Sequence, residues 1–336
     1  MDTMNLSTWH GMRARDPRRL VLGSAQWGMA YGVANRSGEP SDEALASMLA
    51  RAREAGVRTI ETARGYGRSE ARIGRALEPA AGWRLLTKLD PDTHREGLGI
   101  AETLERMSAS LEASRTALGV DTLPVLMLHR FGHRHACGGR LWRALLAERE
   151  AGRIGSLGVC TATPEEAWAA LEDPDIEVLQ VASGLLDLRL HRQGFFPRAR
   201  ELGRTIYVHG VFLYGLAHLD PRVLPASLSA LAEPMQAVAR CAERLGVAPR
   251  AVHLAFAREL PGIHPVVGCE TDGQLAELLD DWGSEAVDAA SLHQLVDALP
   301  TLEAELVDPT RWIADRPERT EGANQTPFAS VATIPG

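Results

Sequence analysis

Eight short apolar runs recur along the 336-residue chain, and amphipathic segments lie between them. These segments place apolar residues at spacings of three and four, with Arg and Glu between them, which is typical of surface helices. Alternation of strand and helix predicts a parallel sheet covered by helices. Eight such units favour an α/β fold of the (β/α)8, or TIM, barrel type, although an open doubly wound sheet gives a similar local pattern. The predicted strands are Leu20 to Gly23, Thr59 to Thr62, Leu85 to Lys88, Val125 to His129, Ser156 to Cys160, Val178 to Val181, Ile206 to Val208 and Ile263 to Val267.

The predicted helices carry recognisable start signals. Ser41, Thr163 and Asp272 precede amphipathic stretches and are predicted N-caps, because short polar side chains accept hydrogen bonds from the first free N–H groups of a helix. A longer insert between the seventh and eighth strands, Gly215 to Ala226, is predicted to cover the mouth of the barrel. The predicted helices include Asp42 to Ala55, Ser69 to Leu77, Ile100 to Leu118, Arg140 to Ala151, Pro164 to Leu171, Ser229 to Leu245 and Pro249 to Glu259.

One barrel domain accounts for most of the chain, over residues 20–315. Residues 1–19 form a predicted N-terminal extension, and residues 316–336, which are polar and without periodicity, form a predicted disordered tail. The sequence shows neither an apolar signal segment nor 18 consecutive apolar residues, so we expect a cytoplasmic protein without a membrane span. A net charge of -8 without a basic window argues against nucleic acid and favours a small-molecule partner.

The cysteines and histidines show no spacing typical of metal sites. His133 and His135 lie two residues apart and have no third ligand at a recognisable distance along the chain, so no metal site is predicted. The cysteines form no CxxC pair, which predicts reduced thiols and no disulfide framework. The four cysteines are Cys137, Cys160, Cys241 and Cys269.

Lysine occurs once in this chain, because Lys88 is the only lysine among 36 Lys and Arg residues. The chain uses Arg at every other basic position, which suggests that Lys88 has a task that a guanidinium does not perform. A lysine ammonium is a compact point charge that can lie beside a reacting group. Lys88 closes the third predicted strand, and active sites of parallel barrels form at the carboxyl ends of the strands. We therefore predict a catalytic role for Lys88.

Three further polar residues lie at the ends of neighbouring strands: Glu61 and Tyr66 at the second and His129 at the fourth. A carbonyl oxygen that gains charge from a hydride needs a proton, and a phenol can give it if a cation lowers its pKa from about 10. We predict Tyr66 as general acid and Lys88 as that cation. Glu61 is then the partner that holds the ammonium, and His129 the donor that orients the carbonyl oxygen. Each residue alone also fits a structural role, but together they favour catalysis.

These residues resemble the aldo-keto reductases. The likeness spans Leu20 to about Trp312 and is carried by Glu61 to Gly67, Leu86-Thr87-Lys88-Leu89 and Leu128-His129-Arg130. Tyr31 to Asn35 and Gly210 to Gly215 look like a bacterial branch often associated with sugar metabolism. The resemblance implies a barrel that binds NADP(H) or NAD(H) in extended form across its mouth, without the glycine-rich fingerprint of dinucleotide-binding sheets.

The resemblance also implies where this cofactor lies. The nicotinamide amide is expected near Cys160, Thr161 and Gln180, and His209 takes the place of the ring that stacks on the nicotinamide. The adenosine end is expected near Gly268 to Gln274 and Glu277. The full set of expected cofactor residues is Gln26, Trp27, Cys160, Thr161, Gln180, His209, Gly210, Phe212, Gly268, Glu270, Thr271, Gln274 and Glu277.

Several positions depart from the pattern of the family. Glu61 stands where the family has Asp, and misplacing a catalytic group by about 1 Å can cost about a hundredfold in rate. Glu270 stands where many NADP-dependent relatives have Arg or Lys. An acid repels a 2′-phosphate but accepts a hydrogen bond from a ribose hydroxyl, so NAD is expected to compete with NADP. Ser183-Gly184 replaces an aromatic-Asn pair of the family, and His209 replaces an aromatic ring. These changes predict weaker binding of the cofactor.

The predicted substrate residues combine aromatic and basic side chains, namely Trp27, Tyr31, Arg64, Arg130 and Tyr214. Such a lining suits a sugar-like or cyclitol-like carbonyl compound, and it also suits an aryl aldehyde. The cluster Arg130, His133, Arg134 and His135 either binds a phosphate or forms a solvated loop. The predicted activity is NAD(P)H-dependent reduction of a ketone or aldehyde. The alternatives are oxidation of a sugar hydroxyl by the same residues and a regulatory barrel that binds cofactor with little turnover.

Overall fold

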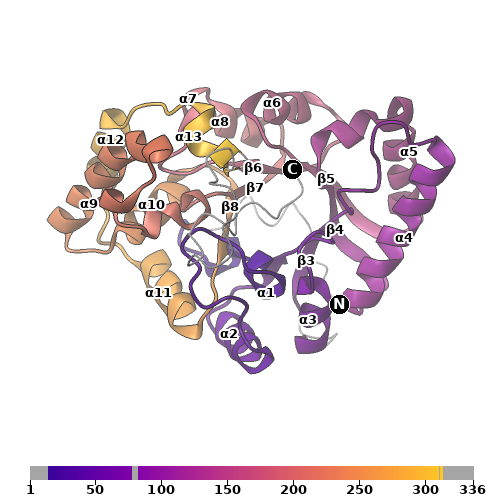
Figure 1. The fold of residues 1–336 in the computed structure, drawn as a ribbon, viewed down its shortest axis with the longest axis horizontal. Coiled ribbons are helices and arrows are strands. Elements are labelled where there is room, and N and C mark those ends of the chain that lie inside the picture. Colours follow the sequence, from indigo (N-terminus) through magenta and orange to yellow (C-terminus); the bar gives the residue numbers. More distant parts are fainter. Residues whose placement is uncertain (1–13, 78–81, 310, 313–336) are drawn as a thin grey trace, which may run out of the picture.

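The computed structural model describes residues 14–77, 82–309 and 311–312. Eight parallel strands close into a barrel in sequence order, with β8 paired to β1. The strands occupy the middle of the molecule and the helices surround them (Figure 1). The closed ring confirms the (β/α)8 barrel and rules out the open doubly wound sheet. The strands are β1 (Val21–Gly23), β2 (Thr59–Glu61), β3 (Arg84–Lys88), β4 (Leu123–Leu128), β5 (Ile154–Cys160), β6 (Val178–Ala182), β7 (Thr205–His209) and β8 (Ile263–Gly268).

Each predicted strand is present and differs from the observed one by at most two residues at either end. The predicted helices are also present, and the largest difference is at the start of α5, where Cys137, Gly138 and Gly139 have left-handed backbone angles. The predicted tail and residues 1–13 of the predicted extension lie outside the described residues. The helices are α1 (Ala25–Gly28), α2 (Asp42–Glu54), α3 (Ser69–Ala76), α4 (Ile100–Leu118), α5 (Ala136–Glu150), α6 (Pro164–Glu172), α7 (Arg189–Arg192), α8 (Phe195–Glu201), α9 (Ala232–Leu245), α10 (Pro249–Glu259), α11 (Asp272–Gly283), α12 (Ala289–Ala298) and α13 (Ala304–Val307).

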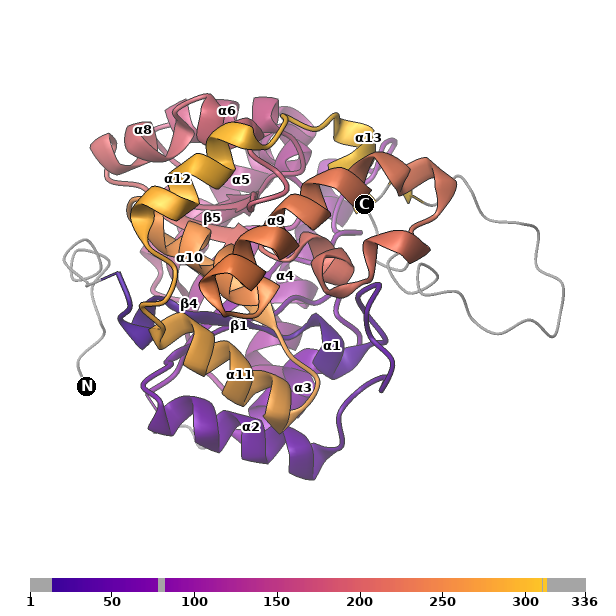
Figure 2. The same cartoon turned by 90° about the vertical axis from the view of Figure 1, so that its left-hand side faces the viewer.

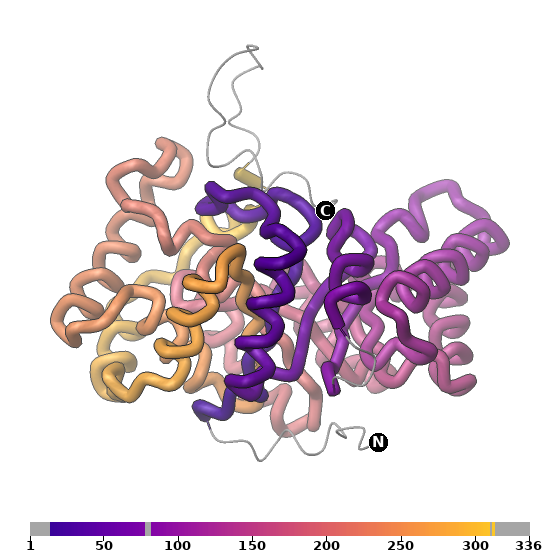
Figure 3. Tube along the Cα trace, turned by 90° about the horizontal axis from the view of Figure 1, so that it is seen from below, coloured from indigo at the N-terminus to yellow at the C-terminus, as the bar shows by residue number. Residues whose placement is uncertain are grey.

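Two of the three predicted N-caps are confirmed, and the third is wrong by one residue. The Ser41 and Thr163 hydroxyls accept hydrogen bonds from backbone N–H groups in the first turns of α2 and α6. At α11 the cap is Thr271, whose extended backbone leaves its hydroxyl facing the Gln274 N–H at 3.1 Å. Asp272 is instead the first helical residue, and it forms an ion pair with Arg51 of α2 at 2.6 Å. This pair links α2 and α11, which lie side by side on the barrel (Figures 2 and 3).

The inside of the barrel explains how the strands present polar groups at one end. Side chains alternate between the two faces of a strand, so residues two apart point the same way. An apolar interior layer contains Leu86, Met127, Val178 and Tyr207 among others. The residues two positions further along β3, β4, β6 and β7 therefore lie one layer above it, at the carboxyl ends. These residues are Lys88, His129, Gln180 and His209.

β5 and β6 lie in close contact at Gly158. A Cβ on Gly158 would overlap the carbonyl oxygen of Val178 and lie 2.7 Å from its Cβ. Gly158→Ala is therefore expected to lower the free energy of unfolding by about 1–3 kcal/mol, because overpacking forces the strands apart. Thermal unfolding measures this as a lower Tm. Gly283→Ala is the control, because a Cβ at this last residue of α11 meets nothing within 4 Å. Equal Tm values for wild type and Gly158→Ala would contradict the tight packing.

Candidate active site

Three donors converge on one carboxylate oxygen at the carboxyl ends of β2, β3 and β6. The Oε1 atom of Glu61 accepts hydrogen bonds from Lys88 Nζ, from Tyr66 Oη at 3.1 Å and from Gln180 Nε2 at 3.2 Å. Lys88 Nζ also donates to Tyr66 Oη at 2.8 Å. The side chains of Lys88 and Glu61 are 1% and 3% exposed, so the ion pair is shielded from water. We call Glu61, Tyr66, Lys88 and Gln180 the Glu61 cluster.

A tight turn after β2 brings Tyr66 to this cluster. The Tyr66 N–H donates to the Ala63 carbonyl, and the Arg64 N–H donates to the carbonyl of Lys88 at 3.3 Å. The turn packs directly on Gly28, where a Cβ would overlap the carbonyl oxygen of Tyr66. Only a residue without a side chain permits this approach, so Gly28 is needed to place the phenol above β2 and β3.

Burial and the neighbouring carboxylate keep Tyr66 protonated. Burial first, and then the negative charge of Glu61, raise the pKa of Tyr66 well above its usual value. The prediction that Lys88 brings this pKa down is therefore wrong for this structure, because loss of hydration and the charge of Glu61 both oppose the phenolate. The phenol thus holds its proton over the ordinary pH range while it contacts the ammonium that stabilises a negative oxygen.

His129 lies beside Tyr66 as a neutral imidazole. The two rings meet edge to face, with centroids 6.0 Å apart. Burial, and next the charge of Lys88, lower the pKa of His129 to about 3. Its Nδ1 is buried and has no hydrogen-bond partner among the residues that the structure describes. A neutral imidazole has one donor and one acceptor nitrogen, so His129 can still donate one hydrogen bond to a bound molecule.

His209 and two tyrosines complete the mouth of the barrel. His209 Nδ1 lies 3.2 Å from Tyr214 Oη, and burial lowers the pKa of His209 to about 3. Its Nε2 is buried and unpaired within the described part of the chain. Tyr31 packs on the apolar group that contains Ala63 and Tyr66. These predicted substrate and cofactor residues therefore lie around the Glu61 cluster.

The insert after β7 reaches the mouth only with its first residues. The Val33 N–H donates to the Tyr214 carbonyl at 3.1 Å, which joins the loop after β1 to the loop after β7. Gly215 lies against Ala34, where an added Cβ would be 3.3 Å from the alanine Cβ. The following segment, including a short 3-10 helix at Pro221–Val223, packs on α9 instead. The prediction that the whole insert covers the mouth is therefore wrong beyond Gly215.

Cys160 and Thr161 end β5 next to Gln180. The Thr161 N–H and hydroxyl donate to the Gln180 carbonyl at 2.9 Å and 3.4 Å. Burial raises the pKa of the half-buried Cys160 thiol to about 11, although the charge of Lys88 acts in the opposite direction. All four cysteines are free thiols.

The alkylation rate of the Cys160 thiol tests whether this thiol is buried and neutral at the mouth of the barrel. Only the thiolate reacts with iodoacetamide, and a pKa of about 11 leaves little thiolate at pH 7. We expect alkylation of Cys160 to be slow at pH 7 and to accelerate about tenfold for each pH unit up to pH 10. Mass spectrometry of the Cys160 peptide measures the rate, with Cys160→Ser as the blank. Fast alkylation at pH 7 would contradict the buried, neutral thiol.

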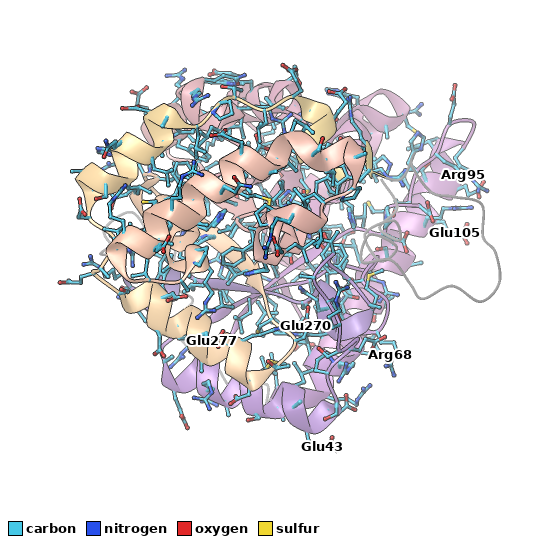
Figure 4. All side chains as sticks on the ribbon, turned by 60° about the vertical axis from the view of Figure 1, so that its left-hand side comes forward. Glu43, Arg68, Arg95, Glu105, Glu270 and Glu277 are labelled. Atoms are coloured by element: carbon cyan, nitrogen blue, oxygen red, sulfur yellow. The ribbon has the colours of Figure 1, made fainter. Side chains whose placement is uncertain are left out.

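The region predicted for the adenosine end lies at the start of α11. Glu270 is 8% exposed, and its carboxylate accepts a hydrogen bond from Gln274 Nε2 at 3.1 Å. In the view of Figure 4, Glu270 lies nearer to the centre of the molecule than Glu277. Glu277 forms an ion pair with Arg250 of α10 at 2.8 Å. The side chain of Gln26 lies against Gly268, where an added Cβ would be 2.6 Å from its Nε2.

Several residues predicted for the mouth are held elsewhere. Trp27 is fully buried and its indole N–H donates to the Cys269 carbonyl at 3.0 Å, so it cannot contact a substrate in this conformation. Arg64 forms an ion pair with the buried Glu70 at 2.6 Å. The ring of Phe212 packs on His218, with centroids 4.8 Å apart.

Two residues of the basic loop after β4 are engaged within the protein. Arg134 is ion-paired with Asp173 and Asp175 at 2.9 Å and 3.2 Å, and its guanidinium lies over the Trp142 ring. His133 is buried. Arg130 is partly exposed beside His129, and its charge contributes to the lowered pKa of that imidazole. Arg130 and His133 of this loop thus lie near enough to His129 to affect its pKa.

Sequence reasoning missed two contacts of the site. Gln180 was expected to hold a cofactor amide, yet its amide also donates to Glu61, 119 residues away along the chain. Glu70 was not singled out, although it is buried and accepts hydrogen bonds from Thr87 and Arg64, both at 2.6 Å. Resemblance to the family placed Gln180 at the site, but no local pattern indicated its partner.

Comparison with known proteins identifies the family. The Aldo/keto reductase family model matches residues 19–298. An aldo-keto reductase of Mycobacterium avium (strain 104) is 31% identical over 151 residues, which are 44% of this chain and 48% of that protein. Another, from Mycobacterium sp. (strain JLS), is 32% identical over 148 residues, which are 44% and 50% of the two chains. The chain thus spans about half the length of the curated relatives it matches.

Solved structures share the fold over nearly their full length. An aldo-keto reductase from Bacillus halodurans in its holo form is 17% identical, with a TM-score of 0.66 over 84% of this chain and 93% of that chain. The glycerol dehydrogenase of Gluconobacter oxydans is 20% identical, with a TM-score of 0.63 over 91% and 95%. No helix in the described ranges is long and apolar enough to cross a bilayer. Because the family model covers most of the chain, we conclude that this protein belongs to the Aldo/keto reductase family.

Proposed function

We propose that this chain is an NAD(P)H-dependent oxidoreductase that reduces a ketone or aldehyde on a polar, sugar-like or cyclitol-like small molecule, with Tyr66 as general acid. The observation that carries the proposal is the Glu61 cluster. A buried phenol contacts a buried ammonium at 2.8 Å, at the carboxyl end of a parallel barrel, where active sites of this fold form. This arrangement suits delivery of a proton to an oxygen that gains negative charge.

The residues at the mouth fit a nicotinamide cofactor. Gln180 Oε1, His129 Nδ1 and His209 Nε2 are buried polar atoms without partners among the described residues, at the ends of three strands. Buried polar groups need hydrogen-bond partners, so this part of the barrel is built for a polar ligand. Gln180, Cys160 and Thr161 would hold the carboxamide of the nicotinamide, and His209 would lie beside its ring. When bound there, the cofactor supplies the hydride.

Each residue of the cluster then has a defined task. The O–H bond of Tyr66 breaks, and its proton moves to the substrate oxygen as that oxygen becomes an alkoxide. The positive charge of Lys88 stabilises the phenolate that remains, and Glu61 holds the ammonium in place. The neutral His129 donates a hydrogen bond to the carbonyl oxygen and fixes its position above the phenol.

The lining of the mouth favours a hydroxyl-bearing substrate. Tyr31 and Tyr214 offer phenolic hydroxyls together with aromatic faces, and Arg130 lies partly exposed beside His129. Aromatic faces pack on the C–H surfaces of sugars while polar groups bond their hydroxyls. Trp27, which is buried, does not contribute. This lining supports a sugar-like or cyclitol-like ketone or aldehyde over a wholly apolar one.

The test is a fluorescence titration with NADPH and NADH, followed by cofactor oxidation with a panel of hydroxylated and aryl carbonyl compounds. We expect binding of at least one cofactor and faster turnover with the hydroxylated compounds. Turnover only in the reverse direction, with polyols and oxidised cofactor, would assign a dehydrogenase to the same residues. Binding without turnover in either direction would favour a regulatory barrel, and no binding would overturn the proposal.

Another prediction concerns the form of the cofactor. The resemblance places the adenosine end at the start of α11, where Gln274 Nε2 donates to the Glu270 carboxylate and Glu277 pairs with Arg250. Glu270, at the start of α11, would repel a 2′-phosphate. We expect wild type to bind NADH at least as tightly as NADPH. Glu270→Arg should shift the ratio of the two Kd values toward NADPH by about tenfold, or about 1.4 kcal/mol.

The matched control for this prediction is Asp280→Arg, which changes the charge of α11 by the same amount at an exposed position. It should leave the ratio of the two Kd values nearly unchanged. An unchanged ratio in Glu270→Arg as well would show that Glu270 does not face the 2′ position.

A further inference from the structure

Gln180 is fixed at both its backbone and its side chain. It is 2% exposed and lies on β6, above Val178 of the apolar layer. Its carbonyl accepts two hydrogen bonds from Thr161. Its Nε2 donates to Glu61 Oε1 at 3.2 Å. The orientation of the amide follows from chemistry, because the opposite orientation would set its acceptor oxygen against a carboxylate oxygen.

Glu61 depends on such a fixed donor more than a shorter acid would. A glutamate has one more rotatable bond than an aspartate, so its carboxylate can take more positions inside the barrel. Of the two other donors to Oε1, Tyr66 loses its proton in the proposed reaction, and the Lys88 ammonium also donates to the phenol oxygen that becomes charged. Gln180 is the donor to this oxygen that makes no contact with the phenol and takes no part in the proton transfer.

We propose that Gln180 is a positioning residue that holds Glu61, and through it the Lys88 ammonium, against Tyr66. The inference rests on the proposed function and deepens it, because it links the amide at the ligand site to the proton donor. With Nε2 committed to Glu61, Oε1 remains as a buried acceptor without a partner among the described residues. This end of the site therefore selects a ligand that presents an N–H donor, as a carboxamide does.

The experiment is a double-mutant cycle with Gln180→Met and Glu61→Gln. Methionine keeps the length of the side chain but cannot donate to the carboxylate. We expect Gln180→Met to lower kcat by about 10–100-fold, because small displacements of catalytic groups lower the rate steeply. In the Glu61→Gln background the same change should lower kcat by less than about threefold, since coupled residues are not additive. Gln193→Met, on the outside of the barrel where Gln193 bonds the Trp168 indole, is the control and should keep the kcat of wild type.

Equal falls of kcat in both backgrounds would overturn the positioning role and leave Gln180 as a ligand contact only. The Kd for cofactor is measured in all four proteins to separate binding from turnover. The same four proteins are also unfolded in urea without cofactor. A non-additive shift of the midpoint supports the contact between Gln180 and Glu61 even if wild type proves inactive, in which case the proposed function fails. Additive midpoints overturn the contact whatever the activity.

Discussion

Replacing Tyr66 with Phe is expected to lower kcat for carbonyl reduction by about 10²–10⁴-fold, which is the usual contribution of a positioned general acid. The substitution removes the only atom that both contacts Lys88 Nζ and carries a transferable proton in the Glu61 cluster. It keeps the ring that packs edge to face with His129. The Kd for cofactor should therefore change by less than about threefold, since the loss concerns the transition state.

Tyr207→Phe is the matched control for this prediction. Tyr207 is another buried tyrosine of the barrel, but it lies in the apolar layer below the site. Its loss should leave kcat within a few-fold of wild type. Steady-state kinetics with NADPH or NADH measure both variants. A Tyr66→Phe protein that keeps more than a tenth of the wild-type kcat would rule out Tyr66 as the main proton donor.

Lys88→Met is expected to damage both turnover and stability. The substitution leaves the carboxylate of Glu61 buried without its cation, and breaking a buried ion pair in this way typically costs about 3–5 kcal/mol. It also removes the charge that stabilises the phenolate, so kcat should fall to the limit of detection. Urea unfolding measures the loss of stability, and single-turnover kinetics measure the loss of activity.

A second substitution separates the two effects of Lys88→Met. In the Lys88→Met, Glu61→Gln double variant no unpaired charge remains inside the barrel, so most of the lost stability should return. Activity should stay absent, because the ammonium is still missing. If stability does not return, the loss in Lys88→Met comes from packing and the buried ion pair is not its cause.

The fold could be predicted from the sequence because the decisive pattern is local. Each strand presents apolar residues to the barrel or to the helices, and this pattern marked the eight strands within two residues of their observed bounds. The N-cap of α11 was predicted wrongly because two neighbouring residues there can each cap a helix. At the start of α11, Thr271 and Asp272 are both good caps; Thr271 caps the helix, and Asp272 pairs with Arg51 of a distant helix.

The site could be predicted only as far as strand ends define it. Lys88 and His129 continue the inward alternation of β3 and β4, so their convergence followed from the fold. The contact of Gln180 with Glu61 and the burial of Trp27 depend on segments far apart in the chain. The direction of the Tyr66 pKa was predicted wrongly for the same reason. Burial of the phenol comes from the whole fold, whereas a nearby lysine can be read from one strand.

Because the chain has a single lysine, it has a single side-chain amine that can react with amine-directed reagents. The other Lys and Arg positions are all arginines, and Lys88 is 1% exposed inside the barrel. The folded surface therefore offers no side-chain amine to acylating reagents, to cross-linkers or to enzymes that conjugate other proteins to lysine. A label on Lys88 would record that the barrel had opened. The rate of amine labelling at Lys88 would thus measure how often the barrel opens at the active site, without any engineered probe.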